Sequence, residues 1–235
     1  SGGAMAMQLH VAHSSRIVGA GIFAGPAYGC ALADGFANSY FRNAGRANDR
    51  CISEEEAALP LAELVARIRR LAASGRIDPV ASLRHAKVWL FCGTNDRRVP
   101  IPAVRAVEDV YRAFVSQPQD VVLRTDVPAG HGWPTKATDS DPNDGVDECA
   151  ITAPPYFNAC GVPATREMLQ FVLGRAARGT VEPGRLVKFD QRPFRAGRES
   201  LRGLGDAGYV CLPTRINRDT RIHVSFHGCC QSIDE

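Results

Sequence analysis

The chain has 235 residues, of which 45% are hydrophobic and 23% are charged, and its formal net charge is +3. This composition is ordinary for a soluble globular protein, and the length suits one large α/β domain with a substantial core. Lys and Arg never run longer than a pair, and no apolar stretch approaches the roughly 20 residues of a membrane span, so we expect neither a nucleic-acid partner nor a membrane segment. No repeat or linker divides the chain, so we expect a single domain over residues 1–235 that acts as a monomer.

The first part of the chain predicts one strand between two helices. Residues 4–13 are rich in Ala, Met and Leu and lack Gly and Pro, which predicts a largely buried helix. Residues 16–25 follow as a short apolar strand. Ser53 and Glu56 form a capping box, and the apolar residues between 61 and 71 recur at helical spacing, so a second helix is expected there.

The rest of the chain alternates strands and helices, as in a parallel sheet. Residues 87–93 (KVWLFCG) are a continuous apolar run, which is typical of a central parallel strand covered on both faces. Helices are predicted at about 101–116 and 165–175, with a long loop at 132–163. Further strands are predicted at 121–127, 208–213 and 221–226.

Four of the eight cysteines bracket two loop-like segments. Cys149 and Cys160 enclose a Pro-rich segment, and Cys30 and Cys51 enclose a polar one. Zinc binding is the alternative, but there is no C-x-x-C pair and no nearby His at ligand spacing. We therefore expect two disulfides, no metal, and an oxidising, extracellular compartment.

Two polar side chains follow consecutive predicted strands. Asp96 lies in GTNDRRVP directly after 87–93, and His131 lies in PAGHGWP after 121–127. Taken alone, Asp96 could be an Asx-turn or helix cap, and His131 an ordinary loop histidine. Because the carboxyl ends of parallel strands meet at one edge of a sheet, we expect an acid–base pair there, with a serine as its partner.

The order of the motifs predicts a rearranged hydrolase. Ser1-Gly2-Gly3, Asp96 and His131 follow the α/β-hydrolase order Ser, Asp, His. The His-Gly loop that helps build the oxyanion hole ordinarily precedes the serine, whereas here HGCCQ comes last, at 227–231. We therefore expect a circularly permuted α/β-hydrolase, with a mostly parallel sheet between helices, truncated at both ends. The amide of Cys229 is the candidate oxyanion donor, and a structural role for this cysteine, in a disulfide that fixes the loop, is compatible with that.

These segments together resemble the extracellular poly(3-hydroxybutyrate) depolymerases, whose α/β-hydrolase fold is circularly permuted. The resemblance spans the chain and is carried by SGGAMAMQL, IFAGP followed by Cys30, GTNDRRVP, AGHGWPT, the loop 149–160, FDQRPF and IHVSFHGCCQ. It implies that Asp96 is the acid and His131 the base of a Ser-His-Asp triad, and that Cys229 gives one oxyanion amide. A cysteine pair common in the family near 211–221 is missing, as is the family's C-terminal segment.

The position of the nucleophile depends on how Ser1 is aligned. The family turn reads Gly-Leu-Ser-Ser-Gly-Gly, so the paired glycines align Ser1 with the second serine, which contributes an oxyanion amide. In that register the nucleophile lies just before residue 1, and this fragment is inactive. In the other register Ser1 is itself the nucleophile in a Ser-x-Gly turn.

The resemblance implies a secreted serine esterase that hydrolyses polyester through an acyl-enzyme and needs no metal or organic cofactor. The alternatives are an esterase for small or aryl esters, and a non-catalytic homologue that only binds polymer. Trp133, two residues after His131, is the aromatic side chain we expect to contact substrate, with packing of the loop as the alternative.

Overall fold

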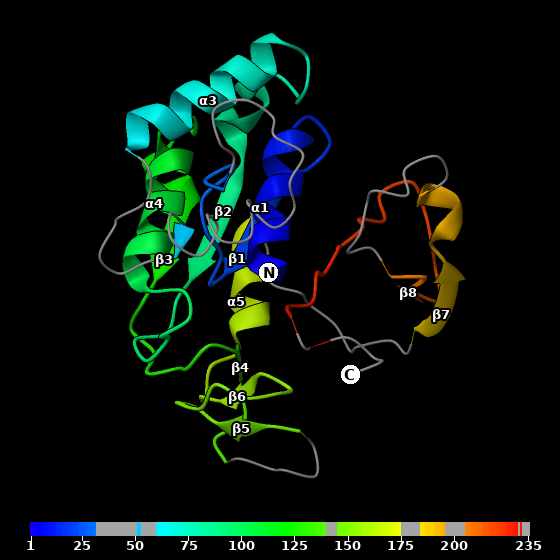
Figure 1. Ribbon diagram of the computed structural model, residues 1–235. Helices are drawn as coiled ribbons and strands as arrows, with labels where there is room; N and C mark the ends of the chain where they lie inside the picture. Colours follow the sequence, from blue (N-terminus) through cyan, green and yellow to red (C-terminus); the bar gives the residue numbers. More distant parts are fainter. Residues whose placement is uncertain are drawn as a thin grey trace. The chain divides into compact units, whose positions relative to one another are not determined.

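A computed structural model describes residues 1–31, 51–52, 60–139, 145–174, 184–195, 205–229 and 231 (Figure 1). Contacts between Cα atoms divide the chain into two compact units, Ser1–Ala176 with Ser225–Glu235, and Ala177–Val224. Each unit is described by itself, and the single domain expected over residues 1–235 stays a prediction.

The first unit contains a parallel sheet of three strands, β1 (Gly19–Phe23), β2 (Lys87–Phe91) and β3 (Val121–Arg124), in the order β1-β2-β3. β2 pairs in parallel with both neighbours, so the predicted central strand is confirmed. Its side chains alternate: Val88 and Leu90 belong to one apolar core, and Trp89 and Phe91 to another. The continuous apolar run arises because both faces of β2 are covered.

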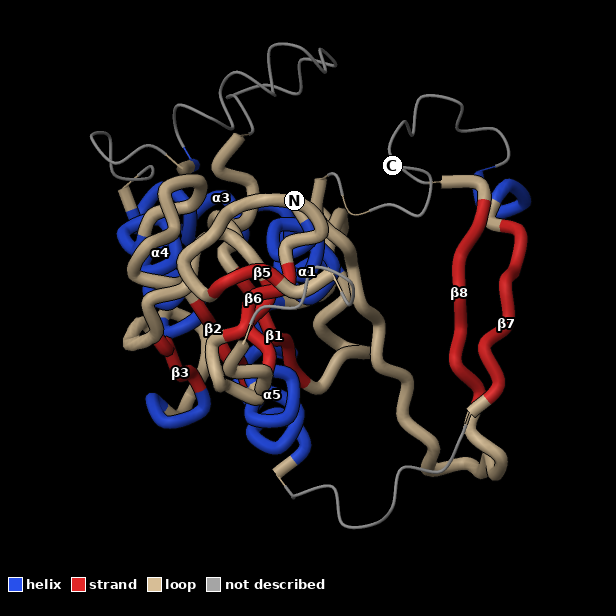
Figure 2. Tube along the Cα trace, turned by 90° about the horizontal axis from the view of Figure 1, so that it is seen from below, coloured by secondary structure: helices blue, strands red, loops and turns tan. Residues whose placement is uncertain are grey.

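Helices cover both faces of this sheet. The first core contains buried residues from α1 (Gly2–Ala12), α3 (Leu61–Ala73) and α4 (Ile101–Arg112), whereas α5 (Ala164–Leu173) contributes to the second core. Figure 2 shows α5 on the opposite side of the sheet from α1 and α4. The expected α/β architecture is therefore present. The four helices lie close to their predicted ranges, while the capping box at Ser53 and Glu56 lies outside the described residues.

A second small sheet lies in the segment predicted as a loop at 132–163. Its strands are β4 (Trp133–Thr135), β5 (Asp147–Glu148) and β6 (Phe157–Ala159), paired in parallel in the order β4-β6-β5. Strands of two or three residues are too short to show an apolar period, so they carry no sequence signal. Single 3₁₀ turns lie at Val80–His85 and Pro118–Asp120.

The second unit contains the antiparallel hairpin of β7 (Arg185–Asp190) and β8 (Ala207–Leu212), with a 3₁₀ turn at Arg192–Arg195. β8 was predicted and β7 was not. The strand predicted at 221–226 is wrong, because no described residue pairs with it. A strand needs a neighbour for its backbone hydrogen bonds, and the apolar alternation of Ile222 and Val224 meets none: these residues are 88% and 54% exposed. No helix among the described residues is long and apolar enough to cross a membrane.

Candidate active site

Asp96 is held at the carboxyl end of β2 by both of its carboxylate oxygens. Oδ1 accepts hydrogen bonds from the backbone N–H groups of Arg98 (2.8 Å) and Val99 (2.9 Å), while Oδ2 lies 2.8 Å from Nδ1 of His131. The Asp96 side chain is only 1% exposed. The Asx-turn and the acid–base pair, alternatives in the sequence, therefore occur together: one oxygen closes the turn and the other orients the histidine.

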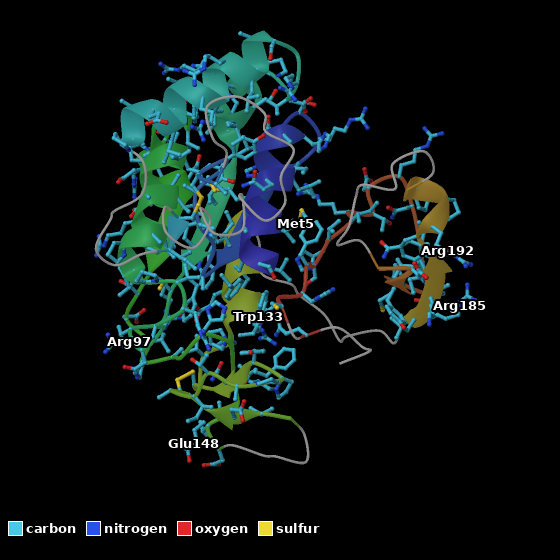
Figure 3. The ribbon with its side chains drawn as sticks, viewed as in Figure 1. Met5, Arg97, Trp133, Glu148, Arg185 and Arg192 are labelled. Atoms are coloured by element: carbon cyan, nitrogen blue, oxygen red, sulfur yellow. A yellow bond between two sulfur atoms is a disulfide. The ribbon has the colours of Figure 1, made fainter. Side chains whose placement is uncertain are left out.

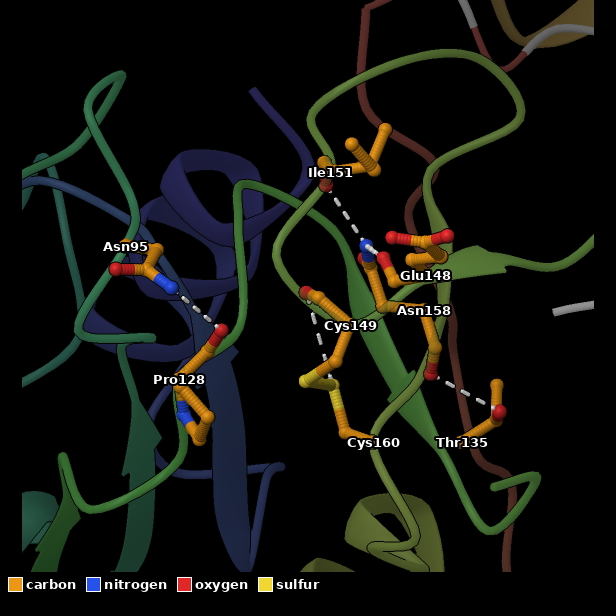
Figure 4. Close-up of a disulfide and its surroundings, with 8 residues drawn as sticks. All are labelled: Asn95, Pro128, Thr135, Glu148, Cys149, Ile151, Asn158 and Cys160. Atoms are coloured by element: carbon orange, nitrogen blue, oxygen red, sulfur yellow. Dashed lines mark hydrogen bonds between the residues drawn. A yellow bond between two sulfur atoms is a disulfide. The ribbon is translucent and has the colours of Figure 1, made fainter. Parts of the chain in front are cut away.

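The loops after β2 and β3 are joined by hydrogen bonds that bring Asp96 to His131. The N–H groups of Thr94 and Asn95 donate to the carbonyl oxygens of Val127 (2.9 Å) and Ala129 (3.1 Å). The Asn95 amide also donates to the Pro128 carbonyl at 2.9 Å (Figure 4). A Cβ atom on Gly93 would lie 2.1 Å from the Ala129 oxygen, so this close approach requires glycine.

The His131 ring is 27% exposed and is oriented by Asp96. Since an ionised carboxylate only accepts hydrogen bonds, the proton of a neutral imidazole lies on Nδ1, which leaves Nε2 as an acceptor. Beneath this pair, burial and the charge of Asp96 raise the pKa of the Cys92 thiol to about 12, so Cys92 stays protonated and donates to the Val99 oxygen. The contact with Asp96 thus leaves Nε2 of His131 as the free nitrogen of the ring, and its role as a base stays a prediction.

Ser1 lies directly before α1, where the helix meets two other segments. A Cβ on Gly2 would lie 2.4 Å from the carbonyl oxygen of Phe226, and one on Gly3 would lie 2.2 Å from that of Phe23, at the end of β1. The Ser1 side chain is exposed, and its hydroxyl makes no capping bond. The first N–H groups of a helix have no partner within the helix, and they favour a negative charge placed before them.

The 226–229 segment lies beside Ser1. A Cβ atom on Gly2 would lie 2.8 Å from the carbonyl oxygen of His227, so this segment passes the residue that follows Ser1. Gly228 N–H donates to Gln231 Oε1 at 2.6 Å, and the Gln231 amide donates to the Pro155 oxygen at 3.1 Å. The structure thus places the segment that precedes Cys229 against the start of α1, and the catalytic roles of Ser1 and Cys229 stay predictions.

Trp133 packs within the protein. Its ring stacks on Phe23 with 3.8 Å between centroids, and its Nε1–H donates to Thr165 Oγ1 at 2.8 Å, so it lies beside α5 (Figure 3). Because Phe23 also lies against Gly3, Trp133 connects the histidine loop to the serine turn. The predicted packing is present, and contact with substrate stays a prediction.

Curated relatives and solved structures resemble the chain over nearly its whole length. A poly(3-hydroxybutyrate) depolymerase of Delftia acidovorans is 32% identical over the full chain, and a polyhydroxybutyrate depolymerase of Talaromyces funiculosus is 27% identical over 99% of it. The crystal structure of PHB depolymerase from Penicillium funiculosum aligns with 90% of the chain at 25% identity and a TM-score of 0.68. A PHB depolymerase with one serine changed to alanine, in complex with an R3HB trimer, aligns equally well.

The chain is therefore similar to PHB depolymerases over nearly its whole length. No family model matches it. The chain spans 45% and 63% of the lengths of these two curated relatives and 60% of each solved chain.

The structure contains both disulfides expected in this PHB depolymerase homologue. Cys30–Cys51 joins Cα atoms 5.6 Å apart within the first core, and Cys149–Cys160 joins Cα atoms 4.7 Å apart beside the second. No cluster of three His, Cys, Asp or Glu side chains suited to a metal occurs among the described residues.

Sequence reasoning missed the residues that contact His131 from the disulfide-closed segment 149–160. The His131 N–H donates to Thr152 Oγ1 at 2.8 Å, and the ring lies edge-on to Tyr156 with 6.4 Å between centroids. Asn158 is buried beneath Gly132. The cysteine spacing marked this segment as a closed loop, but no sequence signal connected it to His131.

Proposed function

We propose that this chain carries the catalytic machinery of a secreted serine esterase that hydrolyses polyester of the poly(3-hydroxybutyrate) type. The observation that carries the proposal is the 2.8 Å contact of the buried Asp96 carboxylate with Nδ1 of His131. The buried carboxylate accepts a hydrogen bond from one ring nitrogen of a part-exposed histidine. The other ring nitrogen is then free to act as the general base that acyl transfer by serine requires.

In the proposed reaction, Nε2 of His131 takes the proton of the serine hydroxyl as its oxygen attacks the ester carbonyl. The imidazolium that forms is stabilised by Asp96, and backbone amides donate to the oxyanion: that of Cys229 and, where the nucleophile precedes Ser1, that of Ser1. Each such donor contributes about 3 kcal/mol to stabilisation of the transition state. His131 then returns the proton to the leaving alcohol, and water hydrolyses the acyl-serine by the same steps.

The attacking hydroxyl belongs to the turn at the start of α1, either Ser1 itself or, in the register favoured by Gly2-Gly3, the residue before it. In the second register Ser1 contributes its amide. Two observations support this turn: the Ser1 hydroxyl is not used as a helix cap, and the unpaired N–H groups of α1 favour negative charge at this point.

A fluorophosphonate that labels activated serines distinguishes these registers. We would treat the 235-residue chain, the same chain with one serine added before Ser1, and their His131→Ala variants, and locate the label by mass spectrometry. Label on Ser1 supports the first register, and label only on the added serine supports the second. If neither chain is labelled while the Asp96–His131 hydrogen bond is present, the serine mechanism is wrong.

A polyester substrate is supported by the relatives, which are named for the depolymerisation of polyhydroxybutyrate. Exposed apolar side chains in the segment that contacts His131, Ile151 and Phe157, suit an apolar chain better than a charged one. Hydrolysis of polymer granules and of short nitrophenyl esters should be compared in the chain that takes the label. Activity on short esters alone would favour a small-ester esterase, and granule binding without hydrolysis would favour a binding protein.

Secretion is supported by the two disulfides, since such bonds persist in oxidising compartments. Thiol titration of the denatured protein isolated from its source tests this. Recovery of free thiols at all four positions would contradict it.

A further inference from the structure

The loop that carries His131 donates three backbone hydrogen bonds to the segment closed by the Cys149–Cys160 disulfide. Three of its N–H groups find their acceptors there: Gly130 on the Cys149 oxygen (2.8 Å), His131 on Thr152 Oγ1 (2.8 Å) and Trp133 on the Tyr156 oxygen (2.7 Å). The backbone on both sides of the histidine is therefore set by the position of this segment.

Asn158 organises this segment from the inside. Its side chain is fully buried, and its amide Nδ2 donates to the carbonyl oxygens of Ile151 (2.8 Å) and Glu148 (3.1 Å), as Figure 4 shows. Two carbonyl partners determine which end of the amide carries the hydrogens. These bonds tie β6 to residues 148–151, which frame Cys149.

The other end of the Asn158 amide lies against the histidine loop. A Cβ on Gly132 would lie 1.7 Å from Asn158 Oδ1, and one on Gly130 would lie 2.4 Å from the oxygen of Ile151, which itself accepts from Asn158. Both neighbours of His131 are thus glycines in close contact with Asn158 or with its hydrogen-bond partner. Oδ1 is buried and has no hydrogen-bond donor among the described residues. A buried amide oxygen without a donor is costly, so Asn158 lowers stability at the point where it meets the histidine loop.

We propose that Asn158 is a positioning residue for His131, acting through Gly132 and through the segment 148–152. In this role Asn158 keeps Nδ1 of His131 directed at Asp96, so that Nε2 stays an acceptor for the serine proton. This inference rests on the proposed function. A loop displaced by an ångström would weaken the Asp96 contact and let the imidazole proton move to Nε2. Asn158 does not touch the reacting atoms.

The test is the tautomer of His131, measured from the ¹⁵N shifts of its ring nitrogens in the folded 235-residue chain at a pH where the ring is neutral. This readout needs no nucleophile. We expect the Nδ1–H tautomer in the unaltered chain and a mixture with Nε2–H in Asn158→Leu, which removes both donors at similar volume. In the chain that hydrolyses ester, Asn158→Leu should lower kcat by about tenfold to a hundredfold while KM changes little.

Matched variants separate positioning from general stability. Removing Cys149–Cys160 by a double Cys→Ala change should shift the tautomer as Asn158→Leu does, whereas removing Cys30–Cys51 in the same way should not, although it also deletes a disulfide. Thr152→Val, at an exposed side chain, removes the acceptor of the His131 N–H and should shift the tautomer less. Thr152→Ser keeps a hydroxyl at this position and should show the tautomer of the unaltered chain.

The proposal is overturned if a folded Asn158→Leu keeps the tautomer of the unaltered chain. If Asn158→Leu does not fold, it is overturned when the Cys149–Cys160 and Thr152→Val variants both keep that tautomer. If Asn158→Leu shifts the tautomer but no serine is labelled in either register, the serine mechanism fails and the positioning of His131 by Asn158 stands.

Discussion

Replacing Asp96 by Asn tests the link between the buried carboxylate and the base. Oδ1 accepts from two backbone N–H groups, those of Arg98 and Val99. The amide oxygen of Asn must take that place, which turns its NH₂ group toward His131. A donor can meet Nδ1 only if Nδ1 is unprotonated, so the imidazole proton moves to Nε2, and Nε2 can no longer accept the proton of the serine. The equivalent change in a serine protease triad costs about 10⁴-fold in kcat, or about 5 kcal/mol of transition-state stabilisation.

The assay is the hydrolysis of a nitrophenyl ester by the chain that takes the fluorophosphonate label, together with the ring ¹⁵N shifts of His131. Asp96→Asn should fold, because its turn hydrogen bonds are kept, and should show the Nε2–H tautomer. Asp126→Asn is the matched control, since Asp126 is an exposed partner of Arg124 at 2.8 Å, and we expect its turnover to stay within about twofold. Turnover of Asp96→Asn within tenfold of the unaltered chain would refute the assignment of the acid.

Three further predictions concern residues that pack in the core or in the loops of the site. Burial lowers the pKa of His10 from 6.5 to about 4, so the unfolded chain binds the proton first, and the free energy of unfolding should fall by about 3 kcal/mol as the pH drops from 7 to 4. Urea titrations across this range should show the extra slope, and His10→Gln should remove it; parallel curves would contradict it. Gly93→Ala places a methyl group 2.1 Å from the Ala129 oxygen and should lower unfolding free energy by about 1–3 kcal/mol in urea titrations; an unchanged value would contradict the close approach. Trp133→Phe loses the bond to Thr165 but can keep the stacking, so it should cost about 1 kcal/mol of stability, and it should raise KM for polyester oligomers; an unchanged KM would refute substrate contact.

The parts of the fold that followed from sequence have local causes. A run such as 87–93 is apolar throughout because both of its faces are covered, so β2 could be recognised as a central strand without knowing its neighbours. The loops after β2 and β3 could then be assigned to the same edge of the sheet, and the structure brings Asp96 and His131 into contact there.

The predictions for 221–226 and for the segment 132–163 failed because those structures depend on contacts with other segments, not on a local pattern. The segment 221–226 alternates as a strand does, but a ladder depends on a partner, and none is present among the described residues. β4, β5 and β6 are too short for any period, and the bonds of Asn158 and the Cys149–Cys160 disulfide tie β6 to residues 148–151 from elsewhere in the segment.

By itself, the sequence indicated the chemistry that we propose for this protein: Asp96 and His131 after consecutive strands, a Ser-Gly-Gly segment, and two disulfide-closed segments. These features depend on residue type and spacing along the chain, which remain visible without coordinates. Only the tertiary structure decided which residues surround His131, because its hydrogen-bond acceptors come from a segment about 20 residues further along the chain. Contacts between residues about 20 positions apart depend on the path by which the backbone comes back to His131, and no local pattern of residues encodes that path.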